Sequence, residues 1–404
     1  MNKLKIALAA IAAMFAGPAQ AQDGIPDSLS RKPTHYAGLD IRPGYVFPTH
    51  SFFKGGNAAG KAISTTFAAH VKYGFRFGRG TRLGRLYPHA VQGVGVSYNT
   101  YFNQRELGSP VAVYIFQTSR VASLSRRLSL DYEWNFGASF GWKKYDENTN
   151  PYNTAIGSTV NAYMSVGLLL DWRMTPNTSL RAGVTAAHYS NGNTEYPNAG
   201  ANTIGATIGV TRHFGGDKAN SSSYDTPPSE AQEQFKRHVS YDIVAYWAIR
   251  KKAVYPPDGT PGMAPGKFAV AGINFTPLYN FNKNLRAGLS LDMQYDESAN
   301  LSNHVAGDGS VDEDVKFYRQ PFSERISVGL SARVEFVMPI FSINAGVGRN
   351  IIYKGSDTDS FYQILALKAD ITRNFFLHIG YELNKFKDPN NLMLGIGVRL
   401  NAKR

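Results

Sequence analysis

Hydrophobic and polar residues alternate along most of this chain. The clearest segment runs from Leu128 to Trp142, where large apolar side chains occupy every second position and Ser129, Asp131 and Glu133 lie between them. A period of two is typical of a β-strand whose two faces meet different surroundings. We therefore expect the apolar residues of this strand, Trp142 included, to face one way and the polar residues the other.

The same alternation predicts about sixteen strands in two groups of eight. The first group covers about 36–48, 62–77, 90–102, 110–120, 127–145, 158–173, 179–190 and 202–214. The second covers about 239–251, 266–279, 285–297, 323–337, 340–353, 360–373, 375–386 and 392–400. A polar stretch over 215–238 is interpreted as a linker.

The N-terminus has the features of a secretory signal peptide. Lys3 and Lys5 precede an apolar run, and Ala19 and Ala21 form a small-x-small cleavage site, so residues 1–21 are predicted to be removed and 22–35 to form a periplasmic leader. No later stretch reaches the roughly 20 apolar residues of a membrane-spanning helix. The chain has no Cys, which excludes a disulfide framework and thiolate metal sites. We expect neither metal nor cofactor.

Composition favours an outer-membrane protein. Aromatic residues make up 13% of the chain, charged residues only 18%, and long regular alternation is typical of a transmembrane antiparallel β-barrel. A secreted β-sandwich is the alternative. The net charge of +13 comes without a recognition helix, an RNA-binding signature or a zinc pattern, so nucleic acid is not expected as a partner. The basic residues either contact anionic lipid headgroups or are simply solvated.

Two architectures use every predicted strand. Tandem eight-stranded barrels are favoured over one sixteen-stranded barrel, because the positions on the lumen side are mostly small and narrow barrels are filled by side chains. Charged residues there are expected to pair within the lumen: His70, Lys72, Arg76 and Arg173 with Asp131, Glu133 and Asp171. The two groups also look like diverged copies, with chance similarity of Gly-rich strands as the alternative; Lys385 and Lys387 then stand where the first group has His188 and Ser190.

The candidate chemistry lies in the last hairpin of the first group. His188 and Ser190 continue the apolar face of the preceding strand, and Asn202 lies on the apolar face of the returning strand. A serine hydroxyl becomes a nucleophile beside a base, and the base needs a third group to hold its tautomer. With short turns and the N-terminus in the periplasm, this hairpin is expected at the outer-leaflet end of the barrel, facing lipid.

The stretch His188-Tyr189-Ser190-Asn191, followed by Pro197-Asn198 and Gly200, resembles the PagL-type lipid A 3-O-deacylases. The resemblance implies an outer-membrane esterase that removes an ester-linked acyl chain from the lipid A of lipopolysaccharide, with His188 as base, Ser190 as nucleophile and Asn198 in the oxyanion hole. A backbone N–H near Asn191 or Gly192 is the expected second oxyanion donor. Asn202 stands where that family has Glu, and can still orient the imidazole.

These expectations define the organisation of the chain. Residues 36–214 are predicted to form the catalytic barrel and 239–404 a second, non-catalytic eight-stranded unit. Expected partners are lipid A and the outer membrane, with a homodimer left open. The alternative function is a non-enzymatic barrel, a pore or a binding protein in which the site has decayed, and Asn202 is its main support.

Overall fold

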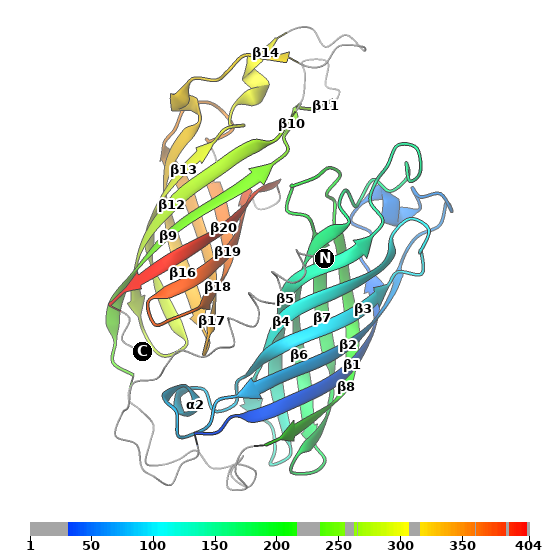
Figure 1. The fold of residues 1–404 in the computed structure, drawn as a ribbon, viewed down its shortest axis with the longest axis vertical. Helices are drawn as coiled ribbons and strands as arrows, with labels where there is room; N and C mark the ends of the chain where they lie inside the picture. Colours follow the sequence, from blue (N-terminus) through cyan, green and yellow to red (C-terminus); the bar gives the residue numbers. More distant parts are fainter. Residues whose placement is uncertain are drawn as a thin grey trace. The chain divides into compact units, whose positions relative to one another are not determined.

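The computed structural model describes residues 31–215, 235–254, 262–264, 266–306, 316–359, 361–384 and 388–401. They form two compact units, each built around a closed antiparallel β-barrel (Figure 1). The predicted signal peptide, residues 22–30 of the leader, residues 216–234 of the linker, and the two lysines Lys385 and Lys387 lie outside the described residues. Within the described part, no helix is both long and apolar enough to cross a membrane.

The first barrel contains eight strands in chain order. They are β1 (Thr34–Val46), β2 (Thr65–Arg76), β3 (Val91–Thr100), β4 (Gly108–Ser123), β5 (Leu128–Trp142), β6 (Val160–Arg173), β7 (Thr178–Ser190) and β8 (Ala201–Phe214). Pairing of β1 with β8, as in Leu39 opposite Val210, closes the ring. A 3₁₀-helix, η1 (Ser51–Lys54), follows β1, and a short helix, α2 (Arg82–Leu86), lies between β2 and β3.

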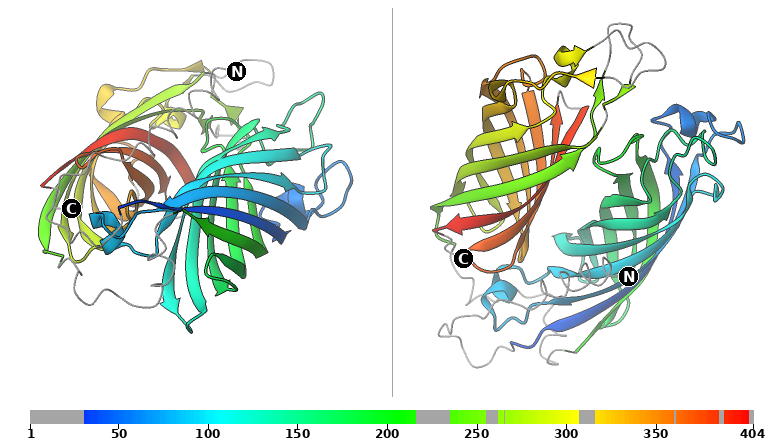
Figure 2. Two further views of the ribbon diagram at one scale, coloured as in Figure 1. Left: turned by 60° about the horizontal axis from the view of Figure 1, so that its bottom comes forward. Right: turned by 45° about the horizontal axis from the view of Figure 1, so that its top comes forward.

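The second barrel repeats this plan. Its strands are β9 (His238–Arg250), β12 (Phe268–Asn280), β13 (Leu285–Asp296), β16 (Ile326–Val337), β17 (Phe341–Ile352), β18 (Phe361–Asp370), β19 (Phe375–Asn384) and β20 (Asp388–Leu400), and β20 pairs with β9 to close the ring (Figure 2). Its connections contain the short elements β10 (Ala253–Val254), β11 (Gly262–Met263), η2 (Leu301–His304), β14 (Val305–Ala306), β15 (Lys316–Phe317) and η3 (Phe322–Glu324). The tandem architecture is therefore confirmed, and the single sixteen-stranded barrel is wrong.

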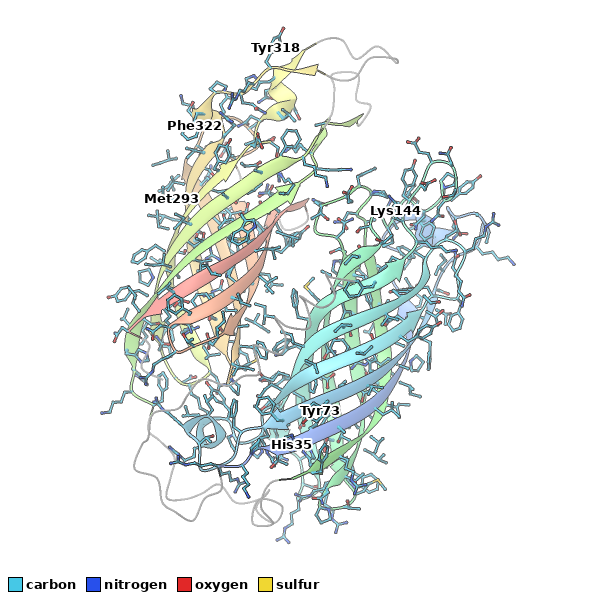
Figure 3. The ribbon with its side chains drawn as sticks, in the orientation of Figure 1. His35, Tyr73, Lys144, Met293, Tyr318 and Phe322 are labelled. Carbon is cyan, nitrogen blue, oxygen red and sulfur yellow. The ribbon has the colours of Figure 1, made fainter. Side chains whose placement is uncertain are left out.

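Each barrel has apolar side chains outside and polar side chains inside. On β2, Val71 is 62% exposed, whereas the neighbouring His70 and Lys72 are buried. Tyr73 and Met293 lie on the outer surfaces of the first and second barrels (Figure 3). An apolar exterior around a polar interior is the arrangement that a barrel surrounded by lipid requires.

Ion pairs fill the lumen of the first barrel. The carboxylate of Glu133 accepts hydrogen bonds from Lys72 (2.7 Å), Arg42 (2.9 Å) and Arg181 (2.9 Å). Asp40 pairs with the same lysine and with Arg42, and all five side chains are buried. The prediction that charged residues pair within the lumen is confirmed for Lys72 and Glu133, and the carboxylates compensate the cost of burying the cations.

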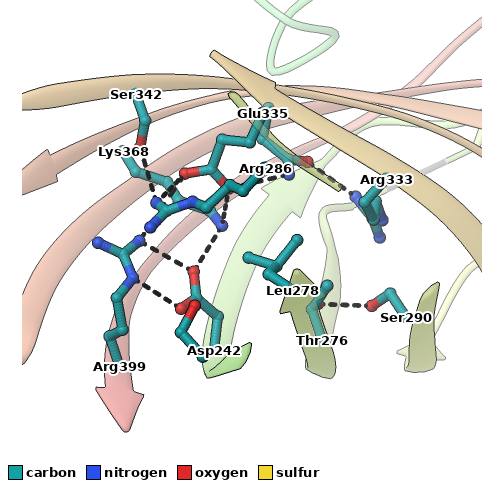
Figure 4. Close-up of polar contacts among 12 residues, drawn as sticks. Asp242, Thr276, Leu278, Arg286, Ser290, Arg333, Glu335, Ser342, Lys368 and Arg399 are labelled. Atoms are coloured by element: carbon teal, nitrogen blue, oxygen red, sulfur yellow. Dashed lines mark hydrogen bonds and ion pairs between the residues drawn. The ribbon is translucent and has the colours of Figure 1, made fainter. Parts of the chain in front are cut away.

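The second barrel contains a cluster of the same composition (Figure 4). Lys368 donates to Glu335 (2.7 Å) and to Asp242 (2.9 Å). Arg399 donates to Asp242 at 2.8 Å, and Arg286 pairs with Glu335. Two carboxylates, one lysine and two arginines thus occupy the centre of this lumen, as two carboxylates, one lysine and two arginines do in the first.

The predicted facing of Trp142 was wrong. Trp142 was expected on the outer face of β5, but it is 2% exposed and packs with Tyr101 and Tyr189. Its indole N–H donates to the Ser139 hydroxyl at 2.8 Å. The reason is Gly141, whose φ of 89° interrupts the extended backbone, so the alternation fails at its last residue.

Candidate active site

The last three residues of β7 place two polar side chains on the outer surface of the first barrel. Tyr189, between them, is 3% exposed and points into the lumen, where its ring stacks on Tyr163 at 5.1 Å. Because side chains alternate along a strand, His188 and Ser190 lie on the opposite face, the face of Val184, which is 54% exposed.

His188 is held by the neighbouring strand. Asn202 on β8 is its cross-strand partner, and the imidazole Nδ1 lies 2.7 Å from the Asn202 Oδ1. An amide oxygen only accepts hydrogen bonds, so in the neutral imidazole Nδ1 carries the proton and Nε2 has the lone pair. The Asn202 Nδ2 donates in turn to the Thr49 hydroxyl at 3.3 Å.

Ser190 is covered by the turn that follows it. It is 9% exposed, although it belongs to the outward face. The backbone of Gly200, which has a φ of 68°, lies against both candidate residues: a Cβ at this position would be 3.2 Å from the His188 Cε1 and 3.4 Å from the Ser190 Cβ. Among the described contacts, none is a hydrogen bond between Ser190 and His188. Catalytic hydrogen bonds often shorten only when substrate binds.

The loop between β7 and β8 is fixed by amide hydrogen bonds. The backbone N–H of Asn191 donates to the Asn198 Oδ1 at 2.9 Å, and the Asn191 side chain donates to the carbonyl of Glu195 at 2.8 Å. The backbone N–H of Gly200 donates to the carbonyl of Ala155 at 3.2 Å, which ties this loop to the one between β5 and β6. The Asn198 carboxamide therefore has its oxygen toward Asn191 and its Nδ2 on the other side.

Thr49 lies in a structured turn after β1. Its neighbour His50 accepts a hydrogen bond from the backbone N–H of Phe52 through Nδ1 (3.3 Å) and so caps η1. Burial, and then the charge of Lys54, lowers the pKa of His50. The neutral ring, which alone has an acceptor nitrogen, is therefore favoured at neutral pH, and this helps to fix the segment that carries Thr49.

The structure thus brings the sequence-predicted residues together in part. His188 and Asn202 are in contact, Ser190 shares their face, and Asn191 is bonded to Asn198. Gly192 follows in a left-handed conformation with a φ of 63°. Sequence reasoning missed Thr49, which is 153 residues from Asn202 and belongs to no recognisable pattern. Across the described residues, no group of three His, Cys, Asp or Glu side chains could hold a metal ion.

Two family profiles match this chain. The family profile described as "Lipid A 3-O-deacylase (PagL)" matches residues 85–211, and the profile described as "Acyloxyacyl hydrolase, C-terminal domain" matches residues 239–402. A comparison with curated protein sequences found no match.

Several solved structures are similar to parts of the chain. The crystal structure of the outer membrane enzyme PagL is 13% identical, covers 43% of this chain and 97% of its own, and has a TM-score of 0.30. Neisserial surface protein A is 11% identical, with coverage of 46% and 100% and a TM-score of 0.30. The N-terminal β-barrel domain of Pseudomonas aeruginosa OprF is 9% identical, with coverage of 46% and 100% and a TM-score of 0.26.

The two profiles take in most of both barrels, and the first of them includes the hairpin that carries His188, Ser190 and Asn198. The chain belongs to the PagL-type lipid A 3-O-deacylase family.

Proposed function

We propose that this protein is an outer-membrane esterase that removes an ester-linked acyl chain from lipid A. The observation that carries the proposal is the hydrogen bond of His188 to Asn202, made on the same outward face that holds the Ser190 hydroxyl. A hydroxyl, an imidazole and an orienting amide are the components of a serine hydrolase, whatever the fold that carries them.

The reaction follows from these positions. The Ser190 Oγ attacks the ester carbonyl while the His188 Nε2 takes its proton, which gives a tetrahedral intermediate. The intermediate expels the sugar oxygen, which receives the proton from His188, and the acyl group stays on Ser190. A water molecule activated by His188 then releases the fatty acid and restores the serine.

The oxyanion needs donors that are already in place. We assign this role to the Asn198 Nδ2 and the backbone N–H of Gly192. The N–H of Asn191 is used differently: it holds the Asn198 oxygen at 2.9 Å and so turns the Nδ2 of that amide away from itself. Asn191 is thus assigned to orienting an oxyanion donor instead of being one.

The location of the site fits a substrate embedded in lipid. Two of the three connections at one end of the first barrel, 124–127 and 174–177, are short, and the third, 77–90, contains α2. The longer loop 143–159 lies at the other end together with the active hairpin. In outer-membrane barrels short turns are periplasmic and long loops extracellular. His188 and Ser190 then open toward the outer leaflet, which contains lipid A.

The alternative of a pore is less well supported. In the first barrel the carboxylate of Glu133 and its three cationic partners occupy the lumen, and Glu335 and Asp242 do the same with theirs in the second. An eight-stranded barrel filled in this way has no aqueous path. We assign the second barrel a non-catalytic role.

Lipid A mass spectrometry tests the proposal. Lipid A is extracted from cells that express the wild type, Ser190→Ala, or Ser158→Ala, a control whose hydroxyl bonds only to the backbone at Val160. The wild type and Ser158→Ala should yield lipid A that lacks one acyl chain, and Ser190→Ala should leave it intact, because the nucleophile is missing. If all three give the same acyl pattern, and purified wild type leaves lipid A untouched, the enzyme proposal is wrong.

A further inference from the structure

A cavity opens at the end of the first barrel that carries the short connections 124–127 and 174–177. Its volume is about 60 Å³, which is room for about four water molecules or for one phosphate group. Tyr36, Thr118 and Arg181 form its buried inner wall. We call this recess the arginine cavity, because six of the described residues that line it are arginines: Arg76, Arg120, Arg126, Arg127, Arg173 and Arg181.

Positive charge exceeds negative charge in the wall of the arginine cavity. Two of the described residues that line it are carboxylates, Asp131 and Asp171. The Arg181 Nε lies 3.5 Å from the Asp171 Oδ2, and the Arg181 Nη1 donates to Glu133 at 2.9 Å, so Arg181 and Asp171 belong to the ion pairs around Glu133. Without these two residues, five arginines and one carboxylate remain in the wall. Cations gathered in a recess produce a strong positive potential, and a bound anion would lower it.

The rim of the arginine cavity is held in place by hydrogen bonds. In the turn between β4 and β5, the Ser125 hydroxyl accepts the backbone N–H groups of Arg127 (3.2 Å) and Leu128 (3.1 Å). Arg173 fixes the same turn, because its backbone N–H donates to the Arg127 carbonyl (2.8 Å) and its guanidinium to the Arg126 carbonyl (2.5 Å). The side chains of Arg126 and Arg127 are exposed. Two guanidinium groups therefore stand at the entrance of the cavity on a turn that is already ordered.

At the corresponding turn, the second barrel has apolar residues instead. Its β16–β17 connection contains Met338 and Ile340, both buried, where the first barrel has Arg126 and Arg127. An eight-stranded ring can thus close this end with apolar side chains, so closure of the barrel does not require arginines there.

We propose that the arginine cavity binds a phosphate group. A planar guanidinium can contact two phosphate oxygens at once, and hydrogen bonds between charged groups are shorter and stronger than those between neutral groups. The phosphate is either free in solution, as inorganic phosphate or a small phosphate ester, or part of the headgroup of an anionic phospholipid in the leaflet at this end. The inference does not depend on the proposed esterase activity, because the cavity lies at the opposite end of the barrel from His188 and Ser190.

Isothermal titration calorimetry with inorganic phosphate tests the first source. The full chain, folded in a zwitterionic detergent at neutral pH, should bind phosphate with a Kd of about 0.1–1 mM, the range expected for a few charge-assisted hydrogen bonds in a partly exposed site. Arg126→Gln combined with Arg127→Gln should weaken binding by about tenfold or more. The matched control combines Arg105→Gln with Lys144→Gln, which removes two exposed charges from loops at the other end of the barrel (Figure 3). It should change the Kd by less than about twofold.

A third variant, Asp131→Asn, should change the affinity in the opposite direction. This substitution removes a carboxylate that repels the bound anion, so the affinity for phosphate should rise by about three- to tenfold. A variant that was merely damaged would bind more weakly. Heat-dependent gel migration verifies that each variant is folded.

The headgroup source is tested in phosphatidylcholine vesicles that contain phosphatidylglycerol. After extraction into detergent, the phosphatidylglycerol that stays bound to the protein is quantified by mass spectrometry. If the cavity holds a headgroup, the wild type and the control pair should retain more of this lipid than Arg126→Gln combined with Arg127→Gln.

Three results would overturn the proposal. In the first, the wild type neither binds inorganic phosphate saturably nor retains more phosphatidylglycerol than the rim variant with Gln at positions 126 and 127. In the second, the control pair weakens binding as much as that rim variant does, because binding would then follow net charge alone. In the third, Asp131→Asn binds phosphate more weakly than the wild type.

Discussion

Replacing Gly200 by Ala is expected to force His188 and Ser190 out of their positions. The new Cβ would lie 2.6 Å from the carbonyl oxygen of Tyr189, so reaching even the 3.0 Å limit of ordinary Cβ contacts requires a shift of at least 0.4 Å (3.0 minus 2.6). That oxygen belongs to the backbone of β7, which cannot move aside by changing a rotamer. Contacts of 3.2 Å to His188 and 3.4 Å to Ser190 pass the shift on to both side chains.

The expected magnitude follows from these distances. A misplacement of about 1 Å can cost about 100-fold in rate, so a shift of roughly half that size should lower kcat by about 10- to 100-fold. The left-handed backbone at Gly200 adds about 1–2 kcal/mol of instability for any residue with a Cβ. That cost is too small to unfold a barrel, and the folded protein should be recovered.

The variant Gly60→Ala separates the strain of a left-handed backbone from the displacement of His188 and Ser190. Gly60 has a φ of 61°, close to the 68° of Gly200, and nothing lies within 4 Å of a Cβ built on it. It should therefore have the same backbone strain and keep wild-type kcat. The two variants are compared by their initial rates of lipid A deacylation in mixed micelles, measured by mass spectrometry. Heat-dependent gel migration verifies that each protein is folded. Equal rates would refute the assignment of Gly200 as the backbone that sets the site.

Two further predictions concern the lumen and the oxyanion hole. Glu133→Gln should destabilise the first barrel by about 3–5 kcal/mol, because Lys72 and two arginines keep their buried charges with one carboxylate fewer. Glu335→Gln should destabilise the second barrel in the same way. Urea unfolding in lipid vesicles measures both effects, and unchanged midpoints would show that these clusters contribute no stability. Asn198→Ala should lower kcat by about 10²–10³ with little change in KM, and single-turnover rates that match the wild type would place the oxyanion donor elsewhere.

The strands and their facing could be read from the sequence because lipid and lumen impose opposite demands on alternate positions. That rule is local, and it failed where the backbone left the extended conformation, as at Gly141 before Trp142. It also gave no reason to single out Asp40 or Arg181, although both belong to the lumen cluster, because partners in a closed ring depend on strands that are distant in sequence.

The sequence likewise predicted the parts of the candidate site that depend on local alternation and on hairpin pairing. His188 and Ser190 follow from alternation, and the pairing of His188 with Asn202 follows from the hairpin register. The Thr49 contact could not be foreseen, because it depends on the closure of β1 against β8 and on the course of a loop that has no pattern of its own. Nor does the sequence reveal that the Asn191 N–H is directed at Asn198.

The ion clusters in the two lumens have a consequence for insertion into the membrane. Glu133 draws its cationic partners from β1, β2 and β7, and Asp242 on β9 reaches Arg399, 157 residues later in the chain. A sheet that has not yet joined its first and last strands would expose these charges, unpaired, beside hydrocarbon. Inserting either sheet into the bilayer before it closes therefore costs electrostatic free energy. This cost favours assembly pathways in which closure and insertion occur together.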